Sequence, residues 1–138
     1  MGKGKFVAGG YYRAMLTLTL QADSYAIAQL PSSAPIPEWA THGSLTSITR
    51  TVDELSVVCA EAGIPDDVTR EGRWRCLRVE GPLDLSLTGI MASLAGPLAD
   101  AGISIFAIST YDTDYLLVRA DALAQAIATL REAGHQVR

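Results

Sequence analysis

The order of hydrophobic spacings in the second half of the chain constrains the fold most strongly. Residues 74–79 form an apolar run typical of a strand. A helix is expected next, because apolar residues recur at helical spacing over about four turns: Leu87, Ile90, Met91, Leu94, Leu98 and Ala101. Residues 103–109 and 115–119 predict two more strands, and residues 121–133 predict a second helix. The second half therefore has the predicted order β-α-β-β-α.

Four residues bear on where these two helices begin and end. Asp121 is expected to cap the N-terminus of the second helix, and Gly102 and Gly134 are expected to end the two helices. Pro97 conflicts with this pattern, because a proline inside a helix removes one backbone hydrogen bond and bends the axis. We therefore expect a local defect in the first helix.

The first half is richer in strands and poorer in helix. A turn at Ala22–Ser24 and a loop with three prolines at residues 31–37 are expected to separate its elements. Residues 36–40 can form at most one helical turn. Alternating or continuous apolar residues predict four strands, over residues 15–20, 25–30, 45–50 and 55–59.

The two halves align with each other as an internal repeat. Ile48–Glu54 aligns with Ile108–Asp114 at an offset of 60 residues, and Leu30-Pro31 aligns with Gly81-Pro82 at an offset of 51. The nine-residue difference falls where the second half has its long helix. The halves therefore look like two copies of one unit, the first with its first helix cut to about one turn.

A β-α-β-β-α-β unit is the ferredoxin-like plan, so we predict an α+β chain with two such units in tandem. Residues 1–14 are expected to be a tail, residues 15–72 the first unit and residues 73–138 the second. The second copy has only Gln136–Arg138 left for its last strand. We hypothesise that the strand at 15–20 fills this vacant edge and interlocks the two units.

Composition and motifs argue against several functions. The net charge is −4, and both lysines lie in the first five residues, so the rest of the chain lacks the basic surface that a nucleic-acid binder needs. No apolar run approaches ~18 residues, so no membrane span is expected, and we predict a cytoplasmic protein. The two cysteines form no CxxC pair. Neither a GxSxG elbow nor a P-loop occurs, so we expect no cofactor and no catalysis.

Several long motifs resemble one family. The segment Arg73–Val118, with GPLDLSLTGI, LADAGISIFAIST and YDTDYLLV, resembles the small bacterial tandem ACT-domain proteins. These are similar to the ACT modules of aspartate kinases and to CASTOR-type arginine sensors. ITRTVDELSVVC (Ile48–Cys59) resembles the N-terminal unit of the same family, and the resemblance covers residues 15–135. It implies a regulatory, non-catalytic fold that senses a ligand, usually an amino acid, and that forms homodimers.

The resemblance also implies a ligand site near the loop Gly81–Ile90. Independently of the family, a helix N-terminus offers unpaired N–H groups and partial positive charge to a carboxylate. Ser86 and Thr88 can contact a ligand or simply cap the helix, and Asp84 can pair with an amino group or only favour the helix dipole. The candidate ligand-binding residues in this loop are Asp84, Ser86, Leu87, Thr88, Gly89 and Ile90.

A second candidate segment joins the two strands that follow: Ser109, Thr110, Tyr111, Asp112, Thr113 and Asp114. It can be an ordinary hairpin loop, although no Gly or Asn provides a standard tight turn. Its two carboxylates suit an ammonium or guanidinium group but are too few to predict a metal site. The equivalent segment of the first half offers Arg50 and Asp53. If the units pack side by side, these loops line one acidic cleft, which favours a cationic amino acid.

Two functions from different classes remain open on these observations. The first is a regulatory sensor that binds an amino acid at the interface between two ACT-like units. The second is a protein-interaction or dimerisation module that binds no small molecule.

Overall fold

The computed structural model describes residues 4–6, 12–83 and 89–138. The chain divides into two compact units. The terminal unit combines Met1–Gln21 with Cys76–Arg138, and the central unit is Ala22–Arg75. Two long strands, β3 (Thr17–Leu30) and β6 (Arg70–Val79), each belong partly to one unit and partly to the other.

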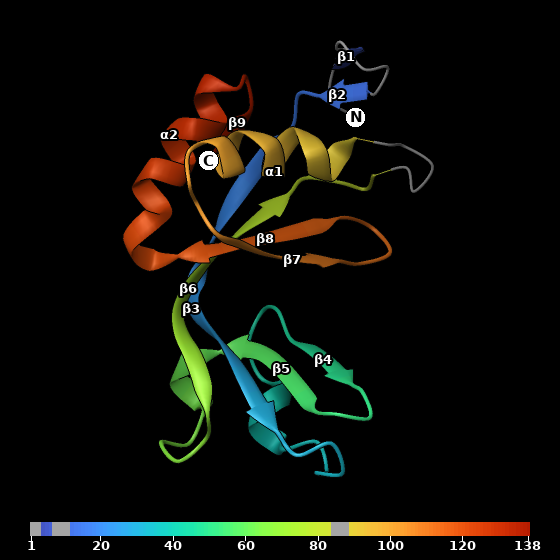
Figure 1. The fold of residues 1–138 in the computed structure, drawn as a ribbon, viewed down its shortest axis with the longest axis vertical. Coiled ribbons are helices and arrows are strands. Elements are labelled where there is room, and N and C mark those ends of the chain that lie inside the picture. The colour runs from blue at the N-terminus through green and yellow to red at the C-terminus, as the bar shows by residue number, and fades with distance from the viewer. Residues whose placement is uncertain (1–3, 7–11, 84–88) are drawn as a thin grey trace. The chain divides into compact units, whose positions relative to one another are not determined.

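The terminal unit has the predicted order of elements (Figure 1). After β6 come α1 (Ile90–Asp100), β7 (Ile105–Ser109), β8 (Asp114–Arg119), the 3-10 turn η3 (Ala120–Ala122), α2 (Leu123–Glu132) and β9 (Gln136–Val137). The strand order is β9-β3-β6-β8-β7. The early residues of β3 therefore lie between β6 and β9, where Glu80 N–H donates to the Thr17 carbonyl at 2.8 Å and Thr17 pairs with Gln136.

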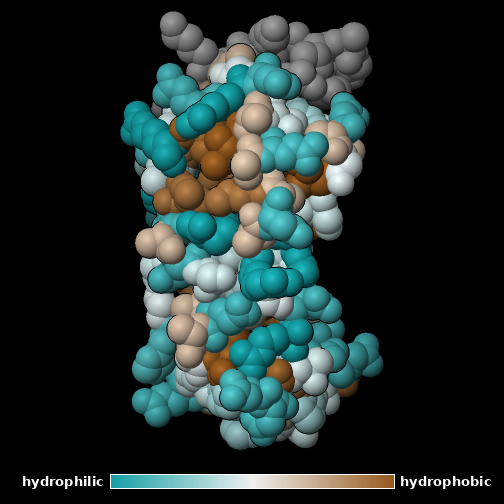
Figure 2. Space-filling model, turned by 90° about the vertical axis from the view of Figure 1, so that its left-hand side faces the viewer, coloured by the Kyte–Doolittle hydropathy of each residue, from teal (hydrophilic) through white to brown (hydrophobic). Residues whose placement is uncertain are grey.

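One face of this sheet forms the core of the terminal unit. Every second residue of the strands is buried against the helices, as in the pairs Leu77 and Val79 on β6 and Leu116 and Val118 on β8. Their partners on the helices are apolar residues at helical spacing: Ile90, Leu94 and Leu98 on α1 and Ala126 and Leu130 on α2. Figure 2 shows hydrophobic surface framed by hydrophilic side chains on the helix-bearing part of the chain.

The central unit repeats the same plan without long helices. Its strands are the later part of β3, β4 (Ser47–Arg50), β5 (Leu55–Ala60) and the early part of β6, in the order β4-β5-β3-β6. Short 3-10 turns, η1 (Glu38–Thr41) and η2 (Glu61–Gly63), stand at the two helix positions. The prediction of an α+β chain with two ferredoxin-like units, the first with a shortened helix, is confirmed. In addition, the second helix of the central unit is reduced to a single turn.

The two hairpins show that the repeat has an offset of 59 residues, not 60. Arg50 pairs with Leu55 across the first hairpin, and Ser109 pairs with Asp114 across the second. Sequence alignment placed Thr51 opposite Tyr111, whereas the structure makes Thr51 equivalent to Thr110. Both threonines close their turn in the same way, because each N–H donates to the carbonyl of the third residue on, at 2.9 and 2.8 Å.

Several local predictions differ from the structure. The turn expected at Ala22–Ser24 is wrong, because β3 continues through these residues without interruption. Polar residues favour turns only where the backbone has no better partner, and here strand pairing resumes at Tyr25 opposite Ala60. Asp121 does not cap α2. It lies inside η3, and the N-cap position is Ala122, whose side chain has no cap hydrogen bond.

The predicted helix ends are confirmed. Gly102 and Gly134 follow α1 and α2 with φ of +74° and +99°. In each case the glycine and the residue after it donate backward to carbonyls of the last turn, at 2.9–3.1 Å. This is the Schellman arrangement, which glycine favours because it has no Cβ.

The first fourteen residues, expected to be a tail, contain a short antiparallel pair. Strands β1 (Gly4–Phe6) and β2 (Tyr12–Ala14) face each other, with Phe6 opposite Tyr12. Over the described residues, no helix is long and apolar enough to cross a lipid bilayer.

Candidate functional site

Two segments predicted to bind a ligand touch each other in the terminal unit. The backbone N–H of Leu83, in the loop after β6, donates to the carbonyl oxygen of Asp112 at 2.7 Å. Gly81 makes the close approach possible, because a Cβ there would lie only 2.9 Å from that same oxygen and 3.2 Å from the Thr113 Cβ. Backbone contacts therefore join the described part of the loop, residues 81–83, to the hairpin turn.

The hairpin turn itself is ordered by its threonines. Thr110 N–H donates to the Thr113 carbonyl, and Thr110 Oγ1 donates to the same oxygen at 3.0 Å. Thr113 is buried, and its hydroxyl donates to the Val79 carbonyl at the end of β6. This internal bonding replaces the Gly or Asn that a tight turn usually needs. Tyr111, at the tip, is 84% exposed.

The carboxylates of this segment lie at the rim of the turn. Asp112 is exposed and Asp114 is half-buried at the start of β8, next to the exposed Ser109 at the end of β7. The arrangement gives an open acidic edge beside a backbone-bonded loop. Such an edge can accept hydrogen bonds from an ammonium or guanidinium group.

The N-terminus of α1 begins at the end of the same loop. Gly89 occupies the N-cap position with φ of +83°, and its carbonyl accepts from the N–H and the hydroxyl of Ser93 at 2.9 and 2.7 Å. Ile90 is buried in the core, so only its backbone can face a ligand. The first turn of α1 contains no acidic residue. Four further predicted residues lie outside the described residues: Asp84, Ser86, Leu87 and Thr88.

Arg50 and Asp53 lie in the central unit. The Arg50 guanidinium donates to the Ser32 carbonyl and, at 2.8 Å, to the Ala34 carbonyl, so it braces the proline-rich loop. Asp53 is exposed, and its N–H donates to Thr51 Oγ1 at 3.1 Å. Their participation in one cleft with the loops of the terminal unit stays a prediction.

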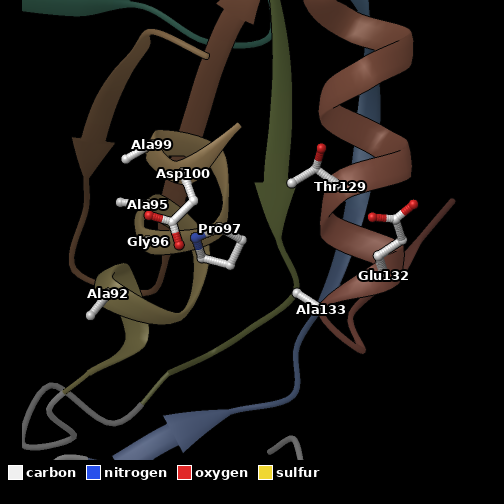
Figure 3. Close-up of a pocket in the computed structure, with 9 residues that line it drawn as sticks. All are labelled: Ala92, Ala95, Gly96, Pro97, Ala99, Asp100, Thr129, Glu132 and Ala133. Atoms are coloured by element: carbon white, nitrogen blue, oxygen red, sulfur yellow. The ribbon is translucent and has the colours of Figure 1, made fainter. Parts of the chain in front are cut away.

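A hollow of about 720 Å³ lies between α1 and α2 (Figure 3). Mostly small residues of α1 and of the end of α2 line it, and Asp100 and Glu132 add two exposed carboxylates. The full lining is Ala92, Ala95, Gly96, Pro97, Ala99, Asp100, Thr129, Glu132 and Ala133. No residue predicted to bind a ligand takes part in it. Within the described ranges, no three potential metal ligands among His, Cys, Asp and Glu come together.

The two cysteines are buried thiols. Burial raises the pKa of the Cys76 thiol to about 12. Burial also raises the pKa of Cys59, although the nearby Arg70 guanidinium has a smaller, opposite effect. Both thiols are therefore neutral and unreactive at ordinary pH.

Sequence reasoning missed two residues that organise this region. Gly81 was placed in the loop but not recognised as the point of closest approach to the hairpin turn. The second is His135, whose buried ring makes two specific hydrogen bonds that require its neutral form. The proline inside α1, Pro97, was the available sequence signal for it.

Comparison with known proteins matches both halves of the chain. A family model described as an ACT domain matches residues 69–132, and a model described as an N-terminal domain matches residues 23–67. The human protein named cytosolic arginine sensor for mTORC1 subunit 1 is 44% identical over 59 residues. This match covers 42% of the chain but only 18% of the human protein, so the chain corresponds to a small part of that relative.

Solved structures extend the similarity over nearly the whole chain. A crystal structure of a protein from Agobacterium tumefaciens is 44% identical with a TM-score of 0.86, covering 90% of this chain and 92% of that one. The aspartate kinase of Clostridium acetobutylicum shares the fold, with 10% identity and a TM-score of 0.60 over 81% of this chain and 33% of the kinase chain. From its family-model match and this full-length relative, the chain belongs to the ACT-domain family.

Proposed function

We propose that this chain is a regulatory, non-catalytic protein that binds an amino acid beside the hairpin turn of the terminal unit. The observation that carries the proposal is the hydrogen bond from Leu83 N–H to the Asp112 carbonyl. It joins the loop after β6 to the acidic turn, and the same loop leads into α1, so we infer that the start of α1 and the turn share the ligand. An amino acid has complementary ends, because its ammonium suits the carboxylates and its carboxylate suits the helix N-terminus.

The comparisons support the same class of ligand. A human relative, matched over 59 residues, is named as a cytosolic arginine sensor. We propose a cytosolic location and a preference for cationic amino acids, since both charged side chains of the turn, Asp112 and Asp114, are acidic. In this proposal the side chains of Asp112 and Asp114 hold the ligand's cationic groups.

The test is a screen of the purified protein against the twenty amino acids by thermal shift, followed by calorimetry on any that respond. Asp112→Asn is expected to weaken binding about 10- to 100-fold, the effect of losing one charge-assisted hydrogen bond. Asp121→Asn is the matched control, because this exposed carboxylate lies in η3, apart from the turn. No response to any amino acid would refute the proposal.

Substituting the equivalent carboxylate of the central unit tests whether one unit or both units contribute to the ligand site. Asp53 occupies the same turn position in the first hairpin as Asp112 does in the second. If Asp53→Asn also weakens binding, the site draws on both units. If only Asp112→Asn does so, the ligand is held by the terminal unit alone.

One observation favours the second candidate function, self-association through strand β7. Among the described residues β7 pairs only with β8, so its other edge has unpaired backbone groups. In an antiparallel pair, residues that bond to the partner strand alternate with residues whose backbone groups point outward. Because Thr110 N–H bonds to Thr113, the N–H and C=O groups of Ile105, Ala107 and Ser109 point away from β8. This edge has no charge and no proline.

A second copy of the chain fits this edge. An antiparallel pair centred on Ala107 would place Ile105 opposite Ser109 of the second copy and Phe106 opposite Ile108, an aromatic and a β-branched side chain. Ala107→Pro removes one outward N–H at a position where an edge strand tolerates proline. Light scattering should then show a dimer for the unmodified chain and a monomer for Ala107→Pro, with unchanged circular dichroism. Monomers in both samples would exclude this interface.

A further inference from the structure

A proline inside α1 leaves one carbonyl of the helix without its usual N–H donor. Pro97 has no N–H, so the carbonyl of Ser93, four residues earlier, lacks its normal helical donor. The Nε2 atom of His135 lies 2.9 Å from that carbonyl oxygen, and both atoms are buried. Because a carbonyl oxygen can only accept, Nε2 must carry the hydrogen. His135 therefore supplies the donor that Pro97 cannot.

The other ring nitrogen has the opposite role. The backbone N–H of Leu16, directly before β3, donates to His135 Nδ1 at 3.0 Å. The two contacts together require the neutral imidazole with its hydrogen on Nε2, and they hold a ring that is 4% exposed. One side chain thus joins the start of β3, the middle of α1 and the segment after α2.

The charged side chains on these elements either have other partners or are exposed. Arg131 of α2 donates to the Val137 carbonyl at 2.8 Å, and Arg138 after β9 pairs with Glu80 at 3.4 Å. Asp100 of α1 and Glu132 of α2 are exposed and line the hollow between the helices. The part of β3 in the terminal unit, residues 17–21, has no charged residue.

We propose that His135 is a pH-sensitive hydrogen-bond link in the terminal unit. Its neutral imidazole joins the start of β3 to α1, and protonation of the ring breaks the bond to β3 and loosens the unit. A proton from solvent takes the lone pair of Nδ1, so Leu16 N–H loses its acceptor and faces an N–H group. The contact with Ser93 can survive, but the link to β3 cannot. This inference stands on the geometry of the ring and does not rest on the proposed ligand.

The direction of the pH effect follows from proton counting. In the unfolded chain the imidazole takes up a proton near pH 6.5, whereas the closed fold holds it neutral. Below that pH the unfolded state binds more protons, so stability falls as pH falls. If the fold excludes the proton entirely, the unfolding equilibrium constant rises about fivefold between pH 6.5 and 5.5.

The chain has only two histidines, which permits a clean experiment. In a His42→Gln background, His135 is the one imidazole left, and His42 itself is exposed. Urea unfolding at pH 7.5, 6.5 and 5.5 should show the fivefold rise in this variant and lose it when His135→Gln is added. An equal pH dependence in both variants would overturn the proposal.

Nitrogen-15 NMR of the His42→Gln protein gives a second readout that does not need the double variant to fold. The ring should show the Nε2–H tautomer at pH 7.5. Exchange protection of the Leu16 amide should fall as the ring becomes protonated. A protonated ring with Leu16 still fully protected, or an Nδ1–H tautomer at pH 7.5, would contradict the proposed pH-sensitive link.

A double-mutant cycle tests the link to the proline. Pro97→Ala restores an N–H for the Ser93 carbonyl and so makes the His135 donor redundant. His135→Phe should therefore raise the unfolding constant about fivefold less in the Pro97→Ala background than in the unmodified chain, the value of one hydrogen bond. Equal effects in both backgrounds would show that the ring does not compensate for Pro97.

Discussion

Replacing Gly81 by alanine tests whether backbone contact between the loop and the hairpin turn organises the candidate site. The added Cβ would lie 2.9 Å from the Asp112 carbonyl oxygen and 3.1 Å from the Leu83 nitrogen. Both are backbone atoms, which cannot rotate away as a flexible side chain can. The loop must therefore move off the turn and stretch the 2.7 Å hydrogen bond between Leu83 and Asp112.

The expected loss of stability follows from these contacts. Losing or stretching one hydrogen bond costs about 0.5–1.5 kcal/mol. Overpacking adds about 1–3 kcal/mol where the neighbours are rigid. The reduced entropy of the unfolded chain offsets about 0.4–1 kcal/mol, because alanine is less flexible than glycine. We expect Gly81→Ala to lower the free energy of unfolding by about 1–3 kcal/mol and to weaken amino-acid binding at the turn.

The structure offers a matched control in the same unit. Gly96 lies inside α1, and apart from its chain neighbours a Cβ there would meet no atom within 4 Å. Helix propensity favours Gly96→Ala by about 0.5–1 kcal/mol, but Pro97 follows directly and disfavours helical geometry for a residue with a Cβ, so the free energy of unfolding should change by less than about 1 kcal/mol.

Urea unfolding should be followed by far-ultraviolet circular dichroism, because α1 and α2 both lie in the terminal unit. Tryptophan fluorescence reports on the central unit, since both tryptophans, Trp39 and Trp74, belong to it. If Gly81→Ala costs no more stability than Gly96→Ala, the loop is not in contact with the turn and the reasoning fails.

Three other substitutions or conditions have defined outcomes. Thr113→Val removes a buried hydroxyl donor, so urea unfolding should show a free energy of unfolding lower by about 1–2 kcal/mol. Thr113→Ser keeps the hydroxyl and should retain most of the stability. Gly102→Ala and Gly134→Ala should both destabilise in thermal melts by about 1–2 kcal/mol, because both positions have positive φ. The two costs should be similar, because the Met15 methyl, 2.1 Å from a Cβ at Gly134, ends a flexible side chain that can rotate away. The pKa of Cys76 is raised to about 12 from an ordinary 9.0, so the unfolded state releases its proton first. Stability should therefore fall as pH rises above 9 in denaturant titrations, less so in Cys76→Ala.

The hydrophobic spacing predicted the terminal unit because each of its elements is long enough to show a period. Leu94 and Leu98 repeat at helical spacing, and Leu116 and Val118 alternate, so packing and pattern agree. The repeat was also visible, but with a register error of one residue. Similar apolar runs, such as Val57-Val58 and Leu116-Leu117, align almost equally well at offsets of 59 and 60. The turn-closing bonds of Thr51 and Thr110 decide between them.

The candidate site was predicted as two segments but not as one neighbourhood. Residue types indicated the loop after β6 and the acidic turn, because carboxylates and a helix start are visible in sequence. Their contact is made by backbone atoms of Leu83 and Asp112, which any residue type provides. Gly81 is a sequence signal for this backbone contact, but a glycine next to a proline is equally typical of an ordinary turn.

The pairing of Pro97 with His135 shows where sequence reasoning stops. A proline inside a helix leaves the carbonyl four residues earlier without its helical N–H donor, and this can be stated from sequence alone. The supplier must be a donor that the tertiary fold brings to the carbonyl of Ser93, and no period or motif connects residues 42 positions apart. The same ring accepts from Leu16, 119 positions away. Because one neutral imidazole meets both demands, substitution at Pro97 and a change in pH should act through the same side chain.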